Sequence, residues 1–468
     1  MASNNSLFEK VNPYSGKPME SVQRSEALNV IQSIQTVKKA LPAWSQTSSE
    51  EKIKVFRSWI EMITANLDQW VSLEATESGL SHEFVREEGF QPVIDLLNQT
   101  IAILNQPPGE SDQSVGILSE GSAQPGQSSS PSVVPPTATG VIAIITSWNL
   151  SFRLVMERLI PGLAAGNVVL VNSSFHVPST KNILSQLLNS DLLKQSVQHL
   201  FSNEDALSIL INHPGIRAIS YVGSEDNFKK LVQPESWLQK KFQLSLGTKN
   251  NLVLLPGCDL SQLPQILRAS LCGMGQLCWN TPRIFLLDSM KEEFVRALKD
   301  FSAGLKPSLV ESDGNLLTPL IDQHRVNATV AKKKQIIQEG GKILCGGEMV
   351  DSPSGLHFNP LFSEDLPNCS ELQQDNLGLP VFLVTTVKYQ HEMAKWANLS
   401  PYSQLTSIWG DETKAGKVAS QLDSAIIQLN HWTTKIPAGT GRKLSFVGNS
   451  DFGIHGSFYS DPRALVKN

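Results

Sequence analysis

The chain has 468 residues, of which 40% are hydrophobic and 18% are charged, and its formal net charge is −5. This composition excludes a disordered chain, and the near-neutral balance excludes a polybasic nucleic-acid-binding protein. At about 150 residues per domain, the length predicts roughly three structural units. The five cysteines are too few for a secreted disulfide framework, which favours a reducing compartment.

The first residues lack the cationic and apolar regions of a signal peptide. No apolar run approaches the roughly 20 residues of a membrane-spanning helix. We therefore expect a soluble, cytoplasmic protein that acts on small molecules and has neither nucleic acid nor a membrane as a partner.

Helices are predicted first along the chain, over residues 24–106, because apolar side chains recur there at three- and four-residue spacing. Residues 107–139 are rich in Pro, Ser and Gly, which is typical of a link or a long loop with one short strand. From Gly140, apolar strands alternate with helices, and a second alternating run begins near Phe242. This order predicts parallel sheets with helices on both faces.

Ligands of such sheets bind at the carboxyl ends of the strands, here 146–149, 172–175 and 223–224. Cys278 follows a Gly-x-Gly pair between a predicted helix and a predicted strand, where a ligand could reach it. Asn149 follows a strand end, where its amide could donate a hydrogen bond to an oxyanion. A thiol and an amide donor are the minimum for adding a cysteine to an aldehyde.

Six segments in order along the chain carry the motifs of one known family: TATGVIAIITSWN, LIPGLAAGNVVLVNSS, HPGIRAISYVGS, LSLGTKN, GQLC and DNLGLPV. Over nearly its whole length, the chain resembles the aldehyde dehydrogenase superfamily. The run from Asn280 to Leu298 and the Asn430-His431-Trp432 turn also resemble the muconic semialdehyde branch.

The resemblance implies an α/β fold with a Rossmann-like cofactor domain, a second α/β catalytic domain and a small β oligomerisation element. The expected bounds are 1–114 and 140–241 for the cofactor-type domain, 242–430 for the catalytic domain, 115–139 and 446–468 for the oligomerisation element, and 431–445 for a return to the cofactor-type domain. It also implies an aldehyde substrate, NAD or NADP, no metal, and a homodimer or homotetramer. Prolines within 115–139 are poor ladder donors, so we expect an atypical assembly element.

Residue by residue, the resemblance makes Cys278 the nucleophile and Asn149 the oxyanion donor. The Gly223–Ser224 turn would receive the pyrophosphate on backbone N–H groups. The full set of expected cofactor-binding residues is Thr146, Ser147, Trp148, Asn172, Ser174, Gly223, Ser224, Gly247 and Asp375.

The chain also departs from the family. Ser245 stands at the position of the catalytic glutamate and cannot be a base near neutral pH, which predicts deacylation slowed by about 10²–10⁴-fold. Asn172 and Phe175 replace the lysine and glutamate that hold the adenosine ribose. Phe228 replaces a small residue of the phosphate-binding helix, where its ring would obstruct the pyrophosphate. Asp375 replaces a glutamate and is one methylene shorter. These changes predict a cofactor site that is weakened or lost.

Three interpretations remain open. The first is an oxidoreductase that forms a thiohemiacetal and a thioester on Cys278, passes a hydride to NAD(P), and releases its acyl group slowly or to a thiol such as coenzyme A. The second is a catalytically impaired member that acts as a scaffold or a hetero-oligomer partner. The third is a nicotinamide-independent thiol esterase or ligand binder. We favour the first because the nucleophile is retained.

Overall fold

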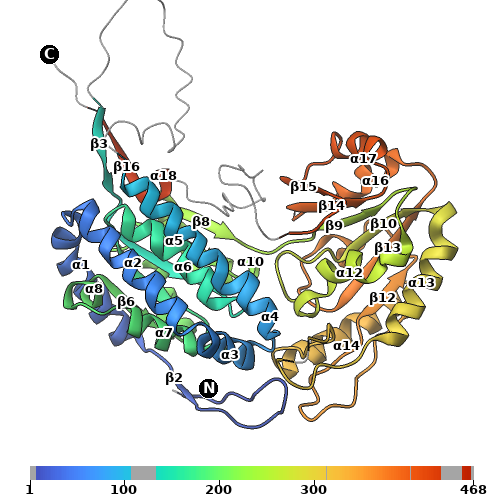
Figure 1. The fold of residues 1–468 in the computed structure, drawn as a ribbon, viewed down its shortest axis with the longest axis horizontal. Coiled ribbons are helices and arrows are strands. Elements are labelled where there is room, and N and C mark those ends of the chain that lie inside the picture. The colour runs from blue at the N-terminus through green and yellow to red at the C-terminus, as the bar shows by residue number, and fades with distance from the viewer. Residues whose placement is uncertain (1–6, 107–132, 313, 401, 434–455, 465–468) are drawn as a thin grey trace, which may run out of the picture.

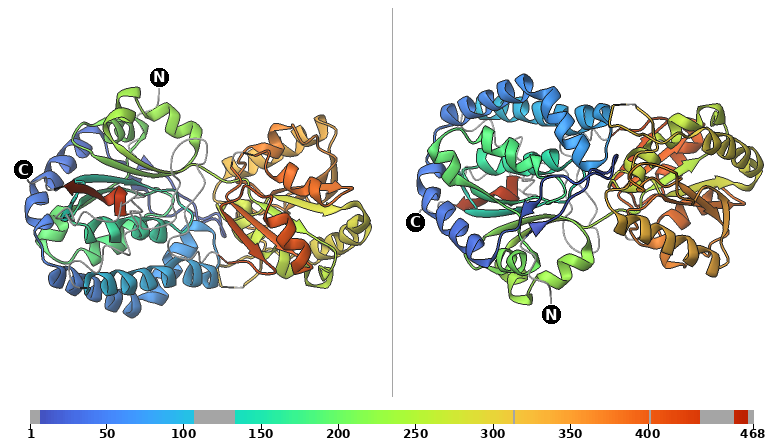
Figure 2. Two further views of the ribbon diagram at one scale, coloured as in Figure 1. Left: turned by 90° about the horizontal axis from the view of Figure 1, so that it is seen from above. Right: turned by 90° about the horizontal axis from the view of Figure 1, so that it is seen from below.

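In the computed structural model, the described residues are 7–106, 133–312, 314–400, 402–433 and 456–464. They form two lobes, each built around a mainly parallel sheet, as Figures 1 and 2 show. The first lobe holds a five-stranded sheet and the second a seven-stranded sheet. The predicted α/β fold is therefore confirmed.

The sheet of the first lobe is parallel throughout and has the order β6-β5-β4-β7-β8. Every residue of the two central strands β4 and β5 is buried, because helices cover both faces. The strands are β4 (Val141–Ile145), β5 (Val168–Asn172), β6 (Val197–Leu200), β7 (Ala218–Val222) and β8 (Lys241–Ser245).

The predicted N-terminal helices are present in the first lobe (Figure 1). Ser48 caps one of them, because its side chain accepts a hydrogen bond from the Glu51 N–H and Glu51 reaches back to Ser48. The helices of this lobe are α1 (Ala27–Ser45), α2 (Ser49–Ala65), α3 (Leu67–Ser78), α4 (His82–Phe84), α5 (Gln91–Leu104), α6 (Ser151–Ala164), α7 (Ser179–Leu187), α8 (Asp191–Ser196), α9 (Glu204–Asn212), α10 (Glu225–Leu231) and α11 (Pro234–Gln239), with a π-helical turn at Val85–Phe90.

The sheet of the second lobe has the order β11-β12-β13-β10-β9-β14-β15, and only the β11–β12 pair is antiparallel. Its strands are β9 (Asn251–Leu254), β10 (Arg283–Leu287), β11 (Lys342–Cys345), β12 (Leu361–Glu364), β13 (Val381–Val387), β14 (Leu405–Trp409) and β15 (Ile426–Leu429). Its helices are α12 (Leu263–Leu271), α13 (Lys291–Gly304), α14 (Gln323–Gln338), α15 (Glu371–Gln374), α16 (His391–Ala397) and α17 (Glu412–Ala419).

Two strand pairs lie outside the main sheets. β1 (Leu7–Phe8) pairs with β2 (Val22–Gln23), and β3 (Val133–Ala138) pairs with β16 (Ser460–Ala464), both antiparallel. The β3–β16 pair extends from a corner of the first lobe (Figure 1). The rest of the expected oligomerisation element, 115–132 and 446–455, and residues 434–445 lie outside the described residues.

Two boundaries differ from the predicted elements. The helical sequence pattern of residues 179–193 predicts one helix, but the structure has two, and Ser190 caps the second by accepting a hydrogen bond from the Leu193 N–H. Phe242 lies in β8, which pairs with β7, so this residue belongs to the sheet of the first lobe. The next strand, β9, starts the second sheet.

Candidate active site

Cys278 lies in a loop, residues 272–279, between α12 and β10, which we call the nucleophile loop. Three consecutive residues, Gly273, Met274 and Gly275, have left-handed φ angles of 59°, 53° and 72°. A Cβ atom on Gly275 would lie 2.1 Å from the carbonyl oxygen of Leu379, so only glycine fits there. The loop therefore turns sharply where Gly275 packs on the backbone of Leu379, just before β13.

The nucleophile loop follows a helix of the second lobe but packs into the core of the first. Leu277 and Trp279 are buried members of the hydrophobic cluster around β4 and β5, and half-buried Cys278 packs against that cluster. The position of Cys278 is thus at the junction of the two lobes, which is where a small ligand can be enclosed.

Side chains from the segment after β8 hold the backbone of Cys278. Thr248 Oγ1 and Asn250 Nδ2 donate to the Cys278 carbonyl oxygen at 2.7 and 2.9 Å. Asn280 Oδ1 accepts from the Leu277 N–H at 2.7 Å. The loop is therefore fixed on both sides of the cysteine. The sequence analysis missed these residues, and the Thr-Lys-Asn string contains no signal for a contact thirty positions away.

The Asn149 amide faces the nucleophile loop. Ser147 Oγ donates to Asn149 Oδ1, which turns the amide nitrogen the other way. That nitrogen donates to the carbonyl oxygen of Gln276 at 3.3 Å, two residues before Cys278. An amide nitrogen carries two hydrogens, so this long bond leaves a second donor for an oxygen formed next to the thiol.

The Glu74 side chain holds the first turn of α6, which follows Asn149. It comes from α3, is fully buried, and its Oε1 accepts the Phe152 N–H at 3.2 Å in the first turn of α6. Leu150, between Asn149 and α6, has a left-handed φ of 53°. Burial raises the pKa of Glu74 to about 8, against the ordinary 4.5, and the Phe152 hydrogen bond lowers it only in part.

We predict that Glu74→Gln stabilises the protein in a pH-dependent way. The folded state holds the Glu74 proton between pH 4.5 and about 8 while the unfolded chain releases it, so wild-type stability falls as the pH rises through this window. At pH 7 the loss is on the order of 3 kcal/mol, and glutamine avoids it while keeping an acceptor for Phe152. Denaturant unfolding at pH 5 to 8 should show a growing gain.

A matched control for this prediction is Glu61→Gln, which removes a carboxylate that is exposed on α2. Its effect on the free energy of unfolding should stay small at every pH. A gain for Glu74→Gln that does not grow with pH would contradict the buried, protonated Glu74.

Ser245, which the sequence motif aligns with the family's catalytic glutamate, ends β8. Its backbone oxygen accepts the Gly223 N–H at 3.1 Å. Its hydroxyl oxygen is buried and makes no hydrogen bond within the described part of the chain. Three residues later, Thr248 donates to the Cys278 carbonyl oxygen, so β8 leads directly into the segment that contacts the backbone of Cys278.

The ends of β4 and β5 bring several expected cofactor residues to one edge of the sheet. The Thr146 N–H donates to the Asn172 carbonyl oxygen at 3.1 Å. Trp148 is buried with Val177 and Ile321 in a small cluster. Ser174 Oγ accepts the His176 N–H at 3.2 Å, which shapes the turn after β5.

The side chains expected near the adenosine ribose are engaged within the protein. Asn172 is buried, and its Oδ1 accepts the Ser202 N–H at 2.8 Å. The Phe175 ring packs on Phe8 of β1 at 4.3 Å between centroids, and the Arg24 guanidinium lies 5.1 Å from the Phe175 centroid. Neither residue offers the charged partners that this position has in the family.

Phe228 is fully buried in an aromatic cluster. Its ring centroid lies 4.8 Å from that of Tyr221 and 5.6 Å from that of Trp237, and Phe242 completes the cluster. The ring thus packs into the interior of the first lobe. It does not stand out over the start of α10 as an obstruction, as we had expected from the sequence.

The Gly223–Ser224 turn lies at the start of α10, as predicted. Ser224 Oγ accepts the Asn227 N–H at 3.2 Å and so caps its own helix. The Tyr221 hydroxyl donates to the Ser224 carbonyl oxygen at 3.3 Å. The next residue, Glu225, accepts a hydrogen bond from the Tyr402 hydroxyl of the second lobe and pairs with Lys229.

Gly247 and Asp375 lie near each other in the second part of the site. A Cβ on Gly247, whose φ is 115°, would lie 2.3 Å from Asn376 Nδ2, so the neighbour of Asp375 packs directly on this glycine. Asp375 is exposed and follows α15. Two of the expected cofactor-binding positions, Gly247 and Asp375, are therefore close to each other.

The contacts of these residues show whether a dinucleotide fits the carboxyl ends of the strands in the first-lobe sheet. The sheet edge and the Gly223–Ser224 turn suit one, as in other doubly wound folds. However, Asn172 and Phe175 are engaged elsewhere, and the carboxylate of Glu225 lies beside the expected pyrophosphate position. The residues present do not fit NAD(P) in the manner of the family.

A buried ionic cluster contacts Trp279, the residue that follows Cys278. Arg153 of α6 donates through Nε to Glu157 at 2.6 Å and through Nη1 to the Glu88 carbonyl oxygen at 2.9 Å. Its guanidinium lies 4.8 Å from the centre of the Trp279 ring, a cation–π distance. Apart from the i,i+4 pair of Arg153 and Glu157, the sequence carries no signal for this cluster.

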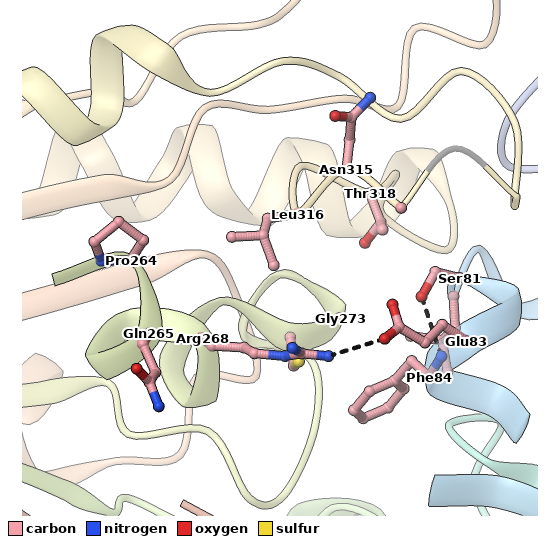
Figure 3. A pocket seen from close by; sticks show the side chains of 13 residues that line it. Ser81, Glu83, Phe84, Pro264, Gln265, Arg268, Gly273, Asn315, Leu316 and Thr318 are labelled. Atoms are coloured by element: carbon pink, nitrogen blue, oxygen red, sulfur yellow. Dashed lines mark hydrogen bonds and ion pairs between the residues drawn. The ribbon is translucent and has the colours of Figure 1, made fainter. Parts of the chain in front are cut away.

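A cavity of about 340 Å³ lies between the lobes, on the side of α4 and α12 (Figure 3). Arg268 and Glu83 form an ion pair of 3.7 Å across it. Cys272 and Gly273 of the nucleophile loop contribute to its wall, whereas Cys278 and Asn149 do not. The cavity is therefore next to the loop but separate from the thiol and its oxyanion donor.

Within the described ranges, no group of three or more His, Cys, Asp or Glu side chains is arranged to hold a metal ion. No helix in the same part of the chain is long and apolar enough to cross a membrane.

Comparisons with known proteins agree with the motifs. A profile described as "Aldehyde dehydrogenase family" matches residues 1–464. The 2-hydroxymuconic semialdehyde dehydrogenase of Pseudomonas sp. (strain CF600) is 24% identical over 474 positions, which cover 97% of this chain and 94% of the relative. The 2-aminomuconic semialdehyde dehydrogenase of Bos taurus is 23% identical, with 98% and 95% covered.

Solved structures show the same fold. A betaine aldehyde dehydrogenase of Staphylococcus aureus superposes with a TM-score of 0.85 at 20% identity, over 99% of this chain and 92% of that one. The aldehyde dehydrogenase of Bartonella henselae gives 0.86 at 19% identity, over 99% and 96%. With its profile match, its ordered motifs and this fold, the chain belongs to the aldehyde dehydrogenase family.

Proposed function

We propose that this chain performs the covalent half of aldehyde dehydrogenase chemistry, in which Cys278 adds to an aldehyde and Asn149 stabilises the oxyanion. The observation that supports it best is the orientation of the Asn149 amide, which Ser147 turns toward the nucleophile loop. A preorganised donor of this kind contributes a factor of roughly 10²–10³ to such additions.

The proposed addition is balanced without any cofactor. A bond forms between the Cys278 sulfur and the carbonyl carbon, the π-electron pair moves to the oxygen, and the oxygen takes up the proton lost by the thiol. The product is a thiohemiacetal, and its formation is reversible. Thr248 and Asn250 hold the cysteine backbone during this step.

The oxidising half of the chemistry is proposed to be weak. In the family, a bound nicotinamide accepts the hydride, and the residues around Asn172, Phe175 and Glu225 do not match such a cofactor. Release of an acyl group by water is also proposed to be slow, because Ser245 cannot act as the base. A thiol acceptor such as coenzyme A would not need that base.

An alternative is a nicotinamide-independent thiol esterase, which the same pair of Cys278 and Asn149 would serve. A purely structural role in a hetero-oligomer is a further alternative. We propose the domain bounds given above, except that β8 (Lys241–Ser245) belongs to the first domain, so the boundary at 241/242 moves to the segment between β8 and β9. We also propose a homodimer or homotetramer formed through the β3–β16 pair, which extends from the first lobe. The two named relatives make a semialdehyde the first substrate class to test.

The test is protection of Cys278 from iodoacetamide by an aldehyde, followed by peptide mass spectrometry without any dinucleotide. Labelling of Cys278 should slow as the aldehyde concentration rises, while labelling of the exposed Cys369 should not change. Asn149→Ala should weaken the protection. Equal labelling of Cys278 with and without aldehyde would refute the proposal.

A further inference from the structure

A hydrogen bond joins the two lobes beside the expected pyrophosphate position. The hydroxyl of Tyr402, which precedes β14 of the second lobe, donates to the Glu225 carboxylate in the first turn of α10. The Tyr402 carbonyl oxygen accepts the Lys249 N–H at 2.9 Å, which ties Tyr402 to the segment that follows Gly247. The bond therefore crosses the space between the Gly223–Ser224 turn and the second lobe.

The Glu225 carboxylate is enclosed and charged. Its side chain is 12% exposed, and Lys229 pairs with it from the next turn of α10. Burial raises the pKa of Glu225, but the hydrogen bonds from Lys229 and Tyr402 outweigh burial and lower it. Glu225 therefore carries a negative charge at neutral pH.

Two more carboxylates act on the same hydroxyl. Burial and the hydrogen bond to Glu225 raise the pKa of Tyr402, and the charges of Asp375 and Asp226 raise it further. Tyr402 thus stays protonated and keeps donating to Glu225. The Tyr402 hydroxyl is thus bonded to one carboxylate and lies within the electrostatic influence of two more, and Lys229 is already paired with Glu225.

A dinucleotide that reached from the Gly223–Ser224 turn to Asp375 would bring the two negative charges of its pyrophosphate into this region. Like charges at close range in a partly enclosed site repel strongly.

We propose that Glu225, held in place by Tyr402, repels the pyrophosphate of a dinucleotide and so lowers the affinity of this chain for NAD(P). This inference rests on the proposed function, since the dinucleotide is the oxidant of that chemistry.

The test is calorimetric titration of the full chain with NAD at low salt. Glu225→Gln removes the charge and keeps the shape, so we expect it to bind NAD about tenfold more tightly than the wild type. The gain should shrink as salt is added, because it is electrostatic. Tyr402→Phe should give a smaller gain, because it breaks the bond and leaves the carboxylate.

Glu235→Gln on α11 is the matched control, since it removes one exposed negative charge from the same lobe. It should leave the NAD affinity unchanged. The proposal is overturned if neither Glu225→Gln nor Tyr402→Phe binds NAD more tightly than the wild type, or if the control gains as much. Protection of Cys278 by aldehyde needs no dinucleotide, so failure here leaves the proposed function standing.

Discussion

Replacement of Cys278 by serine is expected to remove the burst of p-nitrophenolate that the wild type releases from p-nitrophenyl acetate. In the burst, the Cys278 thiol loses its proton to solvent and its sulfur bonds to the acetyl carbon. The ester C–O bond breaks and p-nitrophenolate leaves, which gives an acetyl thioester without any cofactor. Serine at this position has no base to activate it, so the burst rate should fall by roughly 10³-fold or more. Stopped-flow absorbance measures the burst.

Cys272→Ser is the control for that experiment. Cys272 lies in the same loop, but it is buried, and burial raises the pKa of its thiol to about 12. Its replacement should leave the burst intact. A burst that survives in Cys278→Ser would mean that another thiol reacts, and the exposed Cys369 would be the first to examine.

Ser245→Glu is expected to speed the steady rate that follows the burst by about 10²–10⁴-fold, the usual contribution of a general base. The wild type should stall as the acetyl thioester, because no carboxylate activates water there. The Ser245 hydroxyl is buried and forms no hydrogen bond within the described residues, so its replacement breaks no known contact. The burst amplitude itself should change little.

Ser245→Gln separates the base from the size of the side chain. Glutamine has the shape of glutamate and cannot accept a proton near neutral pH, so its steady rate should stay at the wild-type level. If glutamate and glutamine accelerate the steady rate equally, Ser245 does not occupy the position of the base.

Much of the first lobe follows from local patterns. The apolar runs of β4 and β5 predict strands buried on both faces, and the structure has every residue of both buried. Ser48 predicts a helix start, and its capping box is present. The split between α7 and α8 was missed, because Ser190 as an N-cap competes with a periodicity that continues through it.

The candidate site also contains one feature that a local sequence pattern predicts and one that it does not. Asn149 was predicted at a strand end, because strand ends are local features, and its amide does face the nucleophile loop. Phe228 was expected at the surface of α10, and the structure has it inside an aromatic cluster. Helical spacing does not reveal which way the ring turns when Tyr221 and Trp237 are available to pack on it.

By itself, the sequence determined the α/β fold and the order of the motifs, and it singled out Cys278 as a candidate, because strand burial, helix caps and short motifs depend on neighbouring residues. Only the tertiary structure decided which side chains hold the backbone of Cys278, namely Thr248 and Asn250, and that Tyr402 donates to Glu225 between the lobes. These contacts join residues 28 to 177 positions apart. No local pattern specifies such pairs, because they form only when two separately folded sheets bring their edges together. In this chain of ordinary size, mild charge and five cysteines, the sequence therefore singles out one candidate nucleophile, and the packing defines the contacts of its loop.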